Sequence, residues 1–442
     1  MKRVLIITYY WPPSGGAGVQ RWLKFSKYLP LHQWQPVIYT PSNPEAPVDD
    51  PSLQKDVHPE TVVWRRRIWE PYMLYKSFVG MGKGDRINAG FLSEDEKPPR
   101  KEGLAVWIRG NLFIPDARKF WVDPSARFLL KNLRDNPVDA VISTGPPHSM
   151  HLIAFQLHQR MRIPWIADFR DPWTEIDFYN QLKLTRRADR KHHRLEAQVL
   201  TSADRVVVVG ETMAERFRLK AGIQTSVIPN GYDDEDFTGD SAEEDEQIPG
   251  SPGHLFNVVH VGAMNRDRNH PAFWETLASL KREDPEFERE LRITLVGKLD
   301  HSVHRSLAEF QLQDCTKMTP SLPHNQVIPL LRSATVLYLP INHTPNARSI
   351  ATGKIFEYLS AARPILGIGP VDGDAAGILR SCKAGEMVDF TDLKEMKRIL
   401  SEWALRHRQG KLAVRPTNID RYSRRNLTGT YAEVLNQVTQ NT

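Results

Sequence analysis

A cluster of glycines near the start of the chain is the first feature that could do chemistry. An apolar stretch, MKRVLIITYY, leads into WPPSGGAGVQRW, which places Gly15, Gly16 and Gly18 before a helical pattern. Such a turn offers backbone N–H groups to a phosphate, and Gly15 and Gly16 would let the backbone approach a diphosphate. The third glycine of a dinucleotide fingerprint is missing, and the next strand ends without an acidic residue for a ribose hydroxyl. A nicotinamide dinucleotide and a Rossmann oxidoreductase are therefore disfavoured, while a purely structural turn stays open.

Two further segments of the first half place polar side chains directly after predicted strands. They are STGPPHSMH, residues 143–151, and ADFRDPW, residues 167–173. Asp168, Arg170 and Asp171 are a dense charged group that would be costly to bury without partners. We expect these three residues and His148 to be catalytic or acceptor-side groups. The alternatives are an ion pair of Arg170 with either aspartate that only shapes the loop, and a helix-capping role for His148.

Length and composition bound the class of protein. The chain has 442 residues, 40% of them hydrophobic, and a formal net charge of +6 with a pI near 9.1. The length predicts two domains, and the mild basicity suits phosphate-bearing ligands or an anionic membrane surface. Cys315 and Cys382 are the only cysteines, so neither a disulfide framework nor a thiolate metal site is expected. No leader or membrane-spanning stretch is predicted, and a cytoplasmic location is expected.

Short apolar runs alternate with helical patterns through most of the chain, which predicts parallel sheets covered on both faces. Strands of the first half are predicted at residues 4–8, 36–40, 61–64, 140–143, 164–167 and 205–209. Helices of the first half are predicted at residues 16–29, 148–159 and from 211. Strands of the second half are predicted at residues 256–261, 291–296, 335–339 and 364–368.

A change in composition divides the chain. Residues 233–253 contain acidic runs followed by prolines and glycines, as expected of a solvated linker. We therefore predict a first domain at 1–232, a second domain at 254–415, and a closing helix within 416–442 that packs back on the first domain. Residues 43–123 interrupt the first domain and show little further regular structure.

Part of this interruption mixes apolar, aromatic and basic residues. The two segments concerned are LAVWIRGNLF, residues 104–113, and ARKFW, residues 117–121. One interpretation is a segment that lies on a membrane surface near a lipid-linked substrate. The other is an insertion that packs its aromatic side chains on the first domain.

Four segments, from the end of the first domain onward, resemble in their order the GT-B glycosyltransferases of the large retaining family numbered four. They are IPNGYD (228–233), HVGAMNRDRN (260–269), LVGKLD (295–300) and TGKIFEYLSAARPILGI (352–368). The resemblance covers most of the chain and is weakest over residues 43–123. It implies an α/β protein of two doubly wound, Rossmann-like domains that face each other across a cleft. The implied activity is retaining transfer of a sugar from a nucleotide diphosphate sugar to a carbohydrate or lipid-linked acceptor, in polysaccharide synthesis.

The resemblance also indicates where the donor would bind. Departure of the diphosphate leaves negative charge, so the site needs fixed positive charge. The family usually carries an arginine where this chain has Ala263. Arg266 or Arg268, in the same loop, would have to supply the positive charge in its place. Which arginine does so is open, and both could instead be solvated. Lys298 could reach a phosphate or the base, or lie on the surface.

The segment TGKIFEYL is expected to complete the donor site. Glu357 matches the family glutamate that binds the ribose hydroxyls, and a carboxylate suits a diol because it accepts two hydrogen bonds. The backbone N–H groups of Thr352, Gly353 and Lys354, at the positive end of a helix, would lie close to the diphosphate. The alternative for Glu357 is a solvated helix position.

Ser349 departs from the family pattern, because members usually carry a second glutamate in this region. Either Ser349, Asn346 or a backbone amide replaces that glutamate at the donor sugar, or the donor sugar differs, or activity has been lost. A non-catalytic nucleotide-sugar-binding protein and a GT-B-type sugar epimerase therefore stay open as alternatives.

The expected partners are a nucleotide-sugar donor and a carbohydrate or lipid-linked acceptor. A peripheral contact at the inner face of the membrane is open, and no nucleic acid is expected. The fifteen histidines form no cluster with metal-ligand spacing. The resemblance implies transfer without a metal or another cofactor.

Overall fold

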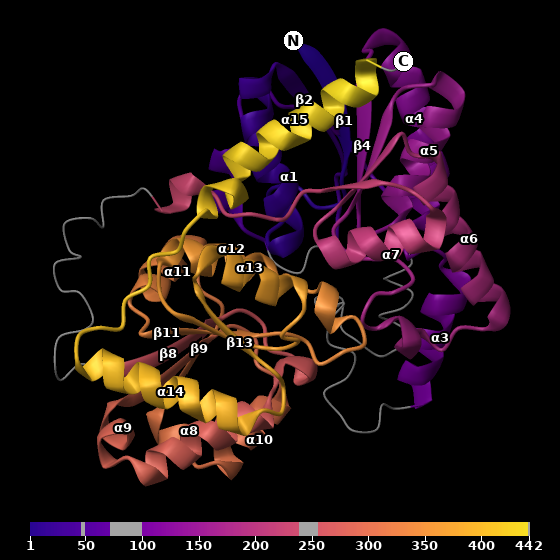
Figure 1. Ribbon diagram of the computed structural model, residues 1–442. Coiled ribbons are helices and arrows are strands. Elements are labelled where there is room, and N and C mark those ends of the chain that lie inside the picture. The colour runs from indigo at the N-terminus through magenta and orange to yellow at the C-terminus, as the bar shows by residue number, and fades with distance from the viewer. Residues whose placement is uncertain (46–48, 71–99, 238–254, 441–442) are drawn as a thin grey trace. The chain divides into compact units, whose positions relative to one another are not determined.

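The computed structural model describes residues 1–45, 49–70, 100–237 and 255–440, which form two compact units (Figure 1). Unit 1 comprises Met1–Asn230 and Arg424–Thr442, and unit 2 comprises Gly231–Ser423. Most of the predicted linker and residues 71–99 of the predicted interruption lie outside the described residues. Each unit has its own parallel sheet.

Unit 1 is built on a sheet whose described strands are all parallel. They are β1 (Lys2–Ile7), β2 (Trp34–Pro41), β3 (Val62–Arg66), β4 (Ala140–Gly145), β5 (Trp165–Phe169), β6 (Arg205–Val208) and β7 (Thr225–Val227). Their order is β3-β2-β1-β4-β5-β6-β7, so the direction of winding changes between β1 and β4. Ligands of doubly wound sheets bind beyond the carboxyl ends of the strands at such a point.

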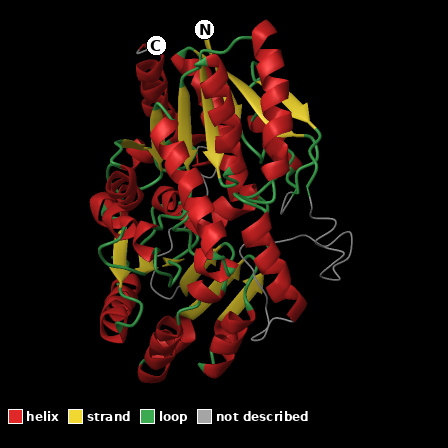
Figure 2. Ribbon diagram, turned by 90° about the vertical axis from the view of Figure 1, so that its right-hand side faces the viewer, coloured by secondary structure: helices red, strands yellow, loops and turns green. Residues whose placement is uncertain are grey.

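Helices cover the sheet of unit 1 (Figure 2). They are α1 (Ala17–Tyr28), α3 (Arg100–Leu112), α4 (Lys119–Asp135), α5 (Ser149–Met161), α6 (Arg186–Ser202), α7 (Glu211–Ala221) and α15 (Arg424–Gln440). The last helix packs on the first, with the rings of Tyr431 and Trp22 centred 5.0 Å apart.

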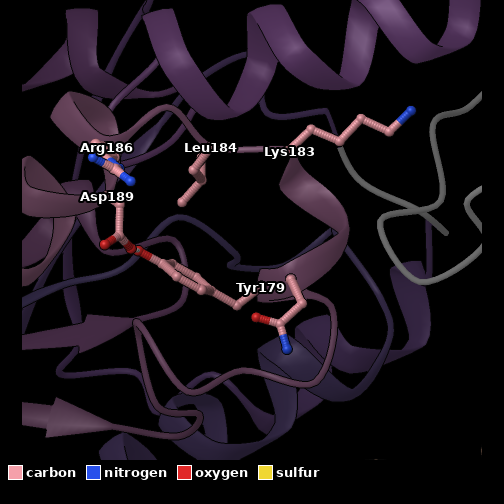
Figure 3. A pocket seen from close by; sticks show the side chains of 6 residues that line it. Tyr179, Lys183, Leu184, Arg186 and Asp189 are labelled. Atoms are coloured by element: carbon pink, nitrogen blue, oxygen red, sulfur yellow. Dashed lines mark hydrogen bonds between the residues drawn. The ribbon is translucent and has the colours of Figure 1, made fainter.

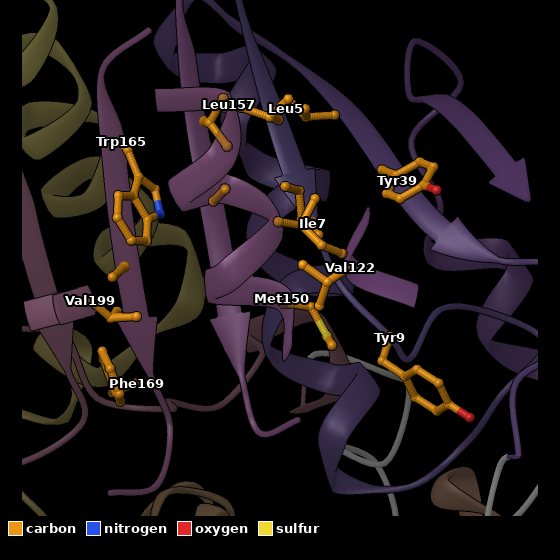
Figure 4. Close-up of a cluster of buried hydrophobic side chains, with 14 of the residues drawn as sticks. Leu5, Ile7, Tyr9, Tyr39, Val122, Met150, Leu157, Trp165, Phe169 and Val199 are labelled. Carbon is orange, nitrogen blue, oxygen red and sulfur yellow. The ribbon is translucent and has the colours of Figure 1, made fainter. Parts of the chain in front are cut away.

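Alternating strand residues supply two separate apolar layers in unit 1. Leu5 and Ile7 of β1 contribute to one core with residues of α4, α5 and α6 (Figure 4). Val4 and Ile6 contribute to the opposite core with residues of α1 and α15. This is the period-two pattern of a sheet buried on both faces.

Unit 2 repeats the doubly wound pattern. Its strands are β8 (Phe256–Val261), β9 (Leu291–Val296), β10 (Thr316–Thr319), β11 (Val336–Pro340), β12 (Ile365–Ile368) and β13 (Gly385–Val388), in the order β10-β9-β8-β11-β12-β13. Its helices are α8 (Pro271–Glu283), α9 (Pro285–Glu290), α10 (His301–Glu309), α11 (His324–Arg332), α12 (Gly353–Ala361), α13 (Asp374–Cys382) and α14 (Leu393–Arg408). The winding changes direction between β8 and β11.

The predicted interruption contains more regular structure than its sequence indicated. The strand predicted at residues 61–64 is present as β3, but α3 and the first turn of α4 lie where no helix was predicted. The apolar residues of α3 are consecutive rather than spaced at helical intervals, and Gly103 and Gly110 lie within it. Pro124 lies inside α4, as its sixth residue. These features hide a helix from a periodicity argument.

None of the helices over the described residues is both long and apolar enough to cross a bilayer.

Candidate functional site

Two glycines bring the loops after β8 and β9 together in unit 2. Gly262 and Gly297 follow these strands with φ angles of +133° and +128°, a backbone conformation that favours glycine. The Gly262 N–H donates to Val296 O at 2.7 Å, and a Cβ on Gly297 would lie 2.6 Å from Gly262 O. Met264 N donates to Lys298 O at 2.9 Å. The two loops therefore form one backbone platform at the strand ends.

The side chain of Lys354 crosses this platform from the first turn of α12. A Cβ on Gly262 would overlap the Lys354 side chain. Burial and the nearby charge of Arg268 lower the pKa of Lys354 to about 8, although Glu357 acts in the opposite direction. The aliphatic part of the Lys354 side chain therefore occupies space that is free only because residue 262 has no side chain. Two cations, Lys354 and Arg268, lie close to the end of β8.

The structure places the two candidate arginines differently. Arg268 donates from Nε to Asn342 Oδ1 at 2.6 Å and from a terminal nitrogen to Ala263 O at 3.0 Å. Asn342 follows β11, so this hydrogen bond spans the point where the winding reverses. Arg266 is exposed on the same short 3-10 turn, Arg266–Arg268. Arg268 is therefore the arginine held at the strand ends beside Lys354.

The start of α12 lies at the same edge. Thr352 is its N-cap residue, and among the described residues the buried Thr352 hydroxyl has no hydrogen-bond partner. The first backbone N–H groups of a helix have no intrahelical acceptor. Tyr358, one turn on, accepts from Val261 N at 3.0 Å and ties α12 to the end of β8. Glu357 is half-buried beside these groups.

Ser349 and Lys298 complete the predicted donor residues. Ser349 is buried in a short turn, and its hydroxyl donates to Asn346 O at 2.8 Å. Asn346 Oδ1 in turn accepts from Thr344 at 2.8 Å. Lys298 is exposed after β9. Both Ser349 and Asn346 therefore make local contacts in this structure.

In unit 1, Asp168 is the centre of a buried polar cluster. Its carboxylate accepts from Arg21 Nε at 3.1 Å and NH2 at 2.7 Å, from Trp22 at 2.9 Å and from Thr144 at 2.9 Å. Burial acts to raise the pKa of Asp168, but the Arg21 charge and these hydrogen bonds outweigh burial and hold the pKa below its ordinary value. Asp168 is fully buried. Its geometry is that of an anchor between β5 and α1, and its ion-pair partner is Arg21 rather than Arg170.

Arg170 binds backbone carbonyls instead of a carboxylate. It donates to Gly18 O at 2.8 Å and to Pro146 O. A Cβ on Gly18 would lie 3.3 Å from the Arg170 guanidinium and 2.9 Å from Tyr10. Gly16, with φ +90°, is the N-cap of α1, and Gly15 is buried before it. The glycine turn is thus tied to the loop after β5, and Asp171 next in sequence is exposed.

His148 lies in an aromatic stack at the end of β4. Its ring is parallel to that of Trp173 with centroids 4.8 Å apart. The Nδ1 of His148 and the Nε2 of neighbouring His151 are buried without hydrogen-bond partners among the described residues. Both nitrogens lie close to Gly145, where a Cβ would be 2.8 Å from the first and 2.5 Å from the second.

Electrostatics keep both imidazoles neutral. Burial, then the neighbouring His151 and Arg170, lower the pKa of His148 well below its ordinary value. Burial lowers the pKa of His151 to about 3. His151 Nδ1 pairs with Ser143 Oγ at 2.8 Å. A neutral imidazole can accept a hydrogen bond from a hydroxyl group.

Side chains of α6 hold the loop after β5 in place. Trp173 Nε1 donates to His192 Nδ1 at 3.0 Å, and Thr174 donates to the buried Glu196 through N at 3.1 Å and Oγ1 at 2.7 Å. Lys220 also binds Glu196. These contacts fix the plane of Trp173 on which His148 stacks.

A recess of about 340 Å³ lies beside the start of α6. It is lined by Tyr179, Asn180, Lys183, Leu184, Arg186 and Asp189 (Figure 3). The Tyr179 hydroxyl donates to Asp189 Oδ1 at 2.9 Å. The recess contains none of the predicted site residues.

The described part of the chain contains no group of three or more His, Cys, Asp or Glu side chains that could hold a metal ion.

Sequence reasoning missed several residues that position these groups. Arg21 lies one helical turn beyond the glycine turn, and Asn342 lies three residues beyond a predicted strand. For Asn342 the sequence did offer a signal, because it is a polar residue shortly after a predicted strand. The sequence offered none for the pairing of Arg21 with Asp168, because the two residues are 147 positions apart.

The two parallel sheets, each with a reversal of winding, define the GT-B fold. Residues 90–236 match a family model described as Glycosyltransferase Family 4. This match and the fold confirm the resemblance found in the sequence. A comparison with curated proteins gave no match.

Several solved structures have folds similar to that of this chain. Sucrose-phosphate synthase from Thermosynechococcus elongatus has a TM-score of 0.61 at 13% identity, with 100% of both chains covered. WaaG, a glycosyltransferase involved in lipopolysaccharide biosynthesis, has a TM-score of 0.56 at 13% identity over 98% of this chain and 99% of its own. A trehalose-6-phosphate structure from E. coli, bound with UDP-2-fluoro glucose, has a TM-score of 0.55 at 13% identity over 98% and 99%.

Proposed function

We propose that this protein is a glycosyltransferase that moves a sugar from a nucleotide diphosphate sugar to a carbohydrate or lipid-linked acceptor, with retention at the anomeric carbon. The proposal rests chiefly on the cationic pair Lys354 and Arg268 at the winding reversal of unit 2. The family match over residues 90–236 and the solved structure holding UDP-2-fluoro glucose support it.

The donor diphosphate is proposed to bind at the start of α12. Lys354 and Arg268 bring fixed positive charge to the end of β8. The Thr352 hydroxyl, which has no partner among the described residues, and the first N–H groups of α12 add donors. Charge that develops on a departing diphosphate is stabilised by donors already in place. Glu357 is proposed to accept hydrogen bonds from the ribose hydroxyls.

The acceptor-side groups are proposed to come from unit 1. His148 places a neutral, buried imidazole at the carboxyl end of β4, and Trp173 holds its ring plane. With retention, the departing phosphate itself would help deprotonate the acceptor hydroxyl. Asp168 would act on this side only by positioning α1, because its carboxylate is fully engaged.

Two matched arginine variants test the donor site. Arg268→Gln is expected to weaken nucleoside diphosphate binding by about 1.5–3 kcal/mol, the usual loss for a hydrogen bond to a charged group. Arg266→Gln, on the same turn, is expected to bind like the parent protein. Calorimetric titration of both variants gives the answer, with thermal melting as the check on folding. Equal affinity of both variants and the parent would refute the assignment.

The variant Glu357→Ala tests whether Glu357 contacts the ribose rather than the diphosphate. The variant is expected to lose affinity for a nucleoside diphosphate and to keep its affinity for inorganic pyrophosphate. An equal loss for both ligands would contradict a ribose contact.

A non-catalytic nucleotide-sugar-binding protein is a second candidate, favoured by Ser349. Its hydroxyl is engaged by Asn346 O, and no second glutamate stands in this region. Release of nucleoside diphosphate from a panel of nucleotide sugars and acceptors distinguishes the two: turnover supports the transferase, and tight binding without turnover supports the binder.

The proposed location is the cytoplasm, and transfer is proposed to need no divalent metal. Cys315 and Cys382 are both buried free thiols, which is compatible with a reducing compartment. Activity that survives a chelator would support the second point, and activity restored only by a divalent cation would refute it.

A further inference from the structure

One face of unit 1 combines exposed aromatic rings with cations and has no part in the proposed transfer chemistry. Trp69, Trp107 and Phe120 are 56%, 37% and 39% exposed. Among the described residues, no other tryptophan or phenylalanine side chain is as exposed as these three. Leu112, at the end of α3, is 55% exposed. Exposed apolar side chains that gather in one place mark interaction sites more often than scattered ones do.

The rings form a continuous cluster with a lysine. Phe120 packs edge-on against Trp69 at 4.8 Å and against Phe113 at 6.0 Å between centroids. The Lys119 ammonium lies 4.9 Å from the centre of the Phe120 ring and donates to Leu112 O at 2.6 Å. We call Trp69, Leu112, Phe113, Lys119 and Phe120 the aromatic cluster.

A basic segment adjoins this cluster. Residues 183–194 contain six Lys or Arg and one Asp, a net charge of +5 against +6 for the whole chain. All six cations are exposed, whereas the same stretch of α6 buries Ala188 and His192. Within the described chain, none of the six forms an ion pair with a carboxylate. Lys183 and Arg186 also line the recess of Figure 3.

Direct contacts join the aromatic cluster to the basic segment. Asn111, next to Leu112, donates to Lys183 O at 3.2 Å and accepts from Thr185 N at 2.7 Å. His192 contacts Gly110 O at 3.3 Å. Burial lowers the pKa of Lys119, and the nearby charge of Lys191 acts in the same direction. The cluster and the segment are therefore parts of one surface.

We propose that this surface docks on an anionic lipid bilayer. The cations of residues 183–194 would contact lipid phosphates, since each basic residue near such a surface is attracted to it. Trp69 and Phe120 would enter the headgroup layer, where aromatic rings are favoured. A single-stranded nucleic acid fits less well, because rings packed edge-on against each other offer few open faces for stacked bases.

Vesicle co-sedimentation of the full chain tests the proposal. The protein is expected to bind vesicles of phosphatidylcholine mixed with phosphatidylglycerol, to bind phosphatidylcholine alone far less, and to be released by high salt. The double variant Arg187→Glu/Lys191→Glu is expected to lower the partition coefficient by about 25-fold or more, from about fivefold for each cation removed. Phe120→Ser is expected to weaken binding at any salt concentration.

The matched control changes the same net charge elsewhere in unit 1. Lys131→Glu/Arg134→Glu lies on the last turns of α4, and both side chains are exposed. This control is expected to bind mixed vesicles within a few-fold of the parent protein, and melting curves of all variants check their folding.

Three results would overturn the proposal. They are equal binding to neutral and anionic vesicles, equal losses in the two double variants, and binding of single-stranded RNA by this face without vesicle binding. The assay contains no nucleotide sugar, so its outcome is independent of the proposed transferase activity.

Discussion

At the scale of single residues, Lys354 makes donor binding depend on pH. Its pKa of about 8 means that the ammonium form, which attracts a diphosphate, is lost as pH rises through 8. Nucleoside diphosphate affinity is therefore expected to fall by up to about tenfold for each pH unit above 8, where the diphosphate itself no longer titrates. Calorimetry at several pH values measures this fall.

Lys354→Met supplies the control. The variant is expected to bind weakly at every pH and to lose the decline above pH 8. Protein stability is expected to change with pH in the opposite direction to affinity. Between pH 8 and the ordinary lysine pKa near 10.5, Lys354 holds fewer protons in the folded than in the unfolded protein. Its contribution to the free energy of unfolding therefore increases with pH in that window. A decline in affinity that persists in Lys354→Met would assign the titration to another group.

At the scale of elements, the platform of Gly262 and Gly297 is expected to tolerate no side chain. In Gly297→Ala, the new Cβ would meet Gly262 O, a backbone atom, at a φ of +128°. We expect a loss of stability of about 1–3 kcal/mol, with weaker nucleoside diphosphate binding because the loop carrying Arg268 is displaced. Gly377→Ala in α13 has no atom within 4 Å of its Cβ and is expected to be neutral or slightly stabilising. Similar melting temperatures for the two variants would contradict this account.

The anchor between α1 and β5 leads to a second prediction at this scale. Arg21→Met would leave the Asp168 carboxylate buried without its counter-charge, at an expected cost of about 3–5 kcal/mol. The paired carboxyl has a lowered pKa, so the pair stabilises the fold above the ordinary pKa of an aspartate and is lost as pH falls through the folded value. The deficit of the variant should therefore be similar at pH 8 and pH 5 and should shrink as the pH falls below the ordinary pKa value of 3.8, as measured by chemical denaturation.

Lys27→Met, on the same helix, is the matched control. Asp56 would keep Lys24 as its partner at 3.0 Å, so a loss below about 1 kcal/mol is expected. An Arg21→Met loss no greater than this would show that the buried pair contributes little.

At the scale of the whole molecule, the sequence predicted the alternation of strands and helices better than the side-chain pairs that join distant segments. Apolar runs such as residues 256–261 are buried on both faces, so they showed the parallel strands directly. The helix α3 was missed because its apolar residues are consecutive. For Asp168 the sequence suggested a catalytic role or a pair with Arg170, and it could not indicate Arg21, the actual partner, because Arg21 is 147 positions away. Residue types at strand ends could be predicted, as Arg268 shows, whereas pairing across the fold required the structure.

The two units have separate apolar cores and should therefore respond separately to their ligands and mutations. Unit 1 is built on two clusters, one of which includes residues of α15, and unit 2 is built on two others. A nucleoside diphosphate that binds unit 2 would stabilise that unit by about 2.7 kcal/mol at a free concentration 100 times the dissociation constant. Scanning calorimetry is expected to show two transitions, of which the ligand raises one and Arg21→Met lowers the other. A single transition shifted by both would show that the units unfold together.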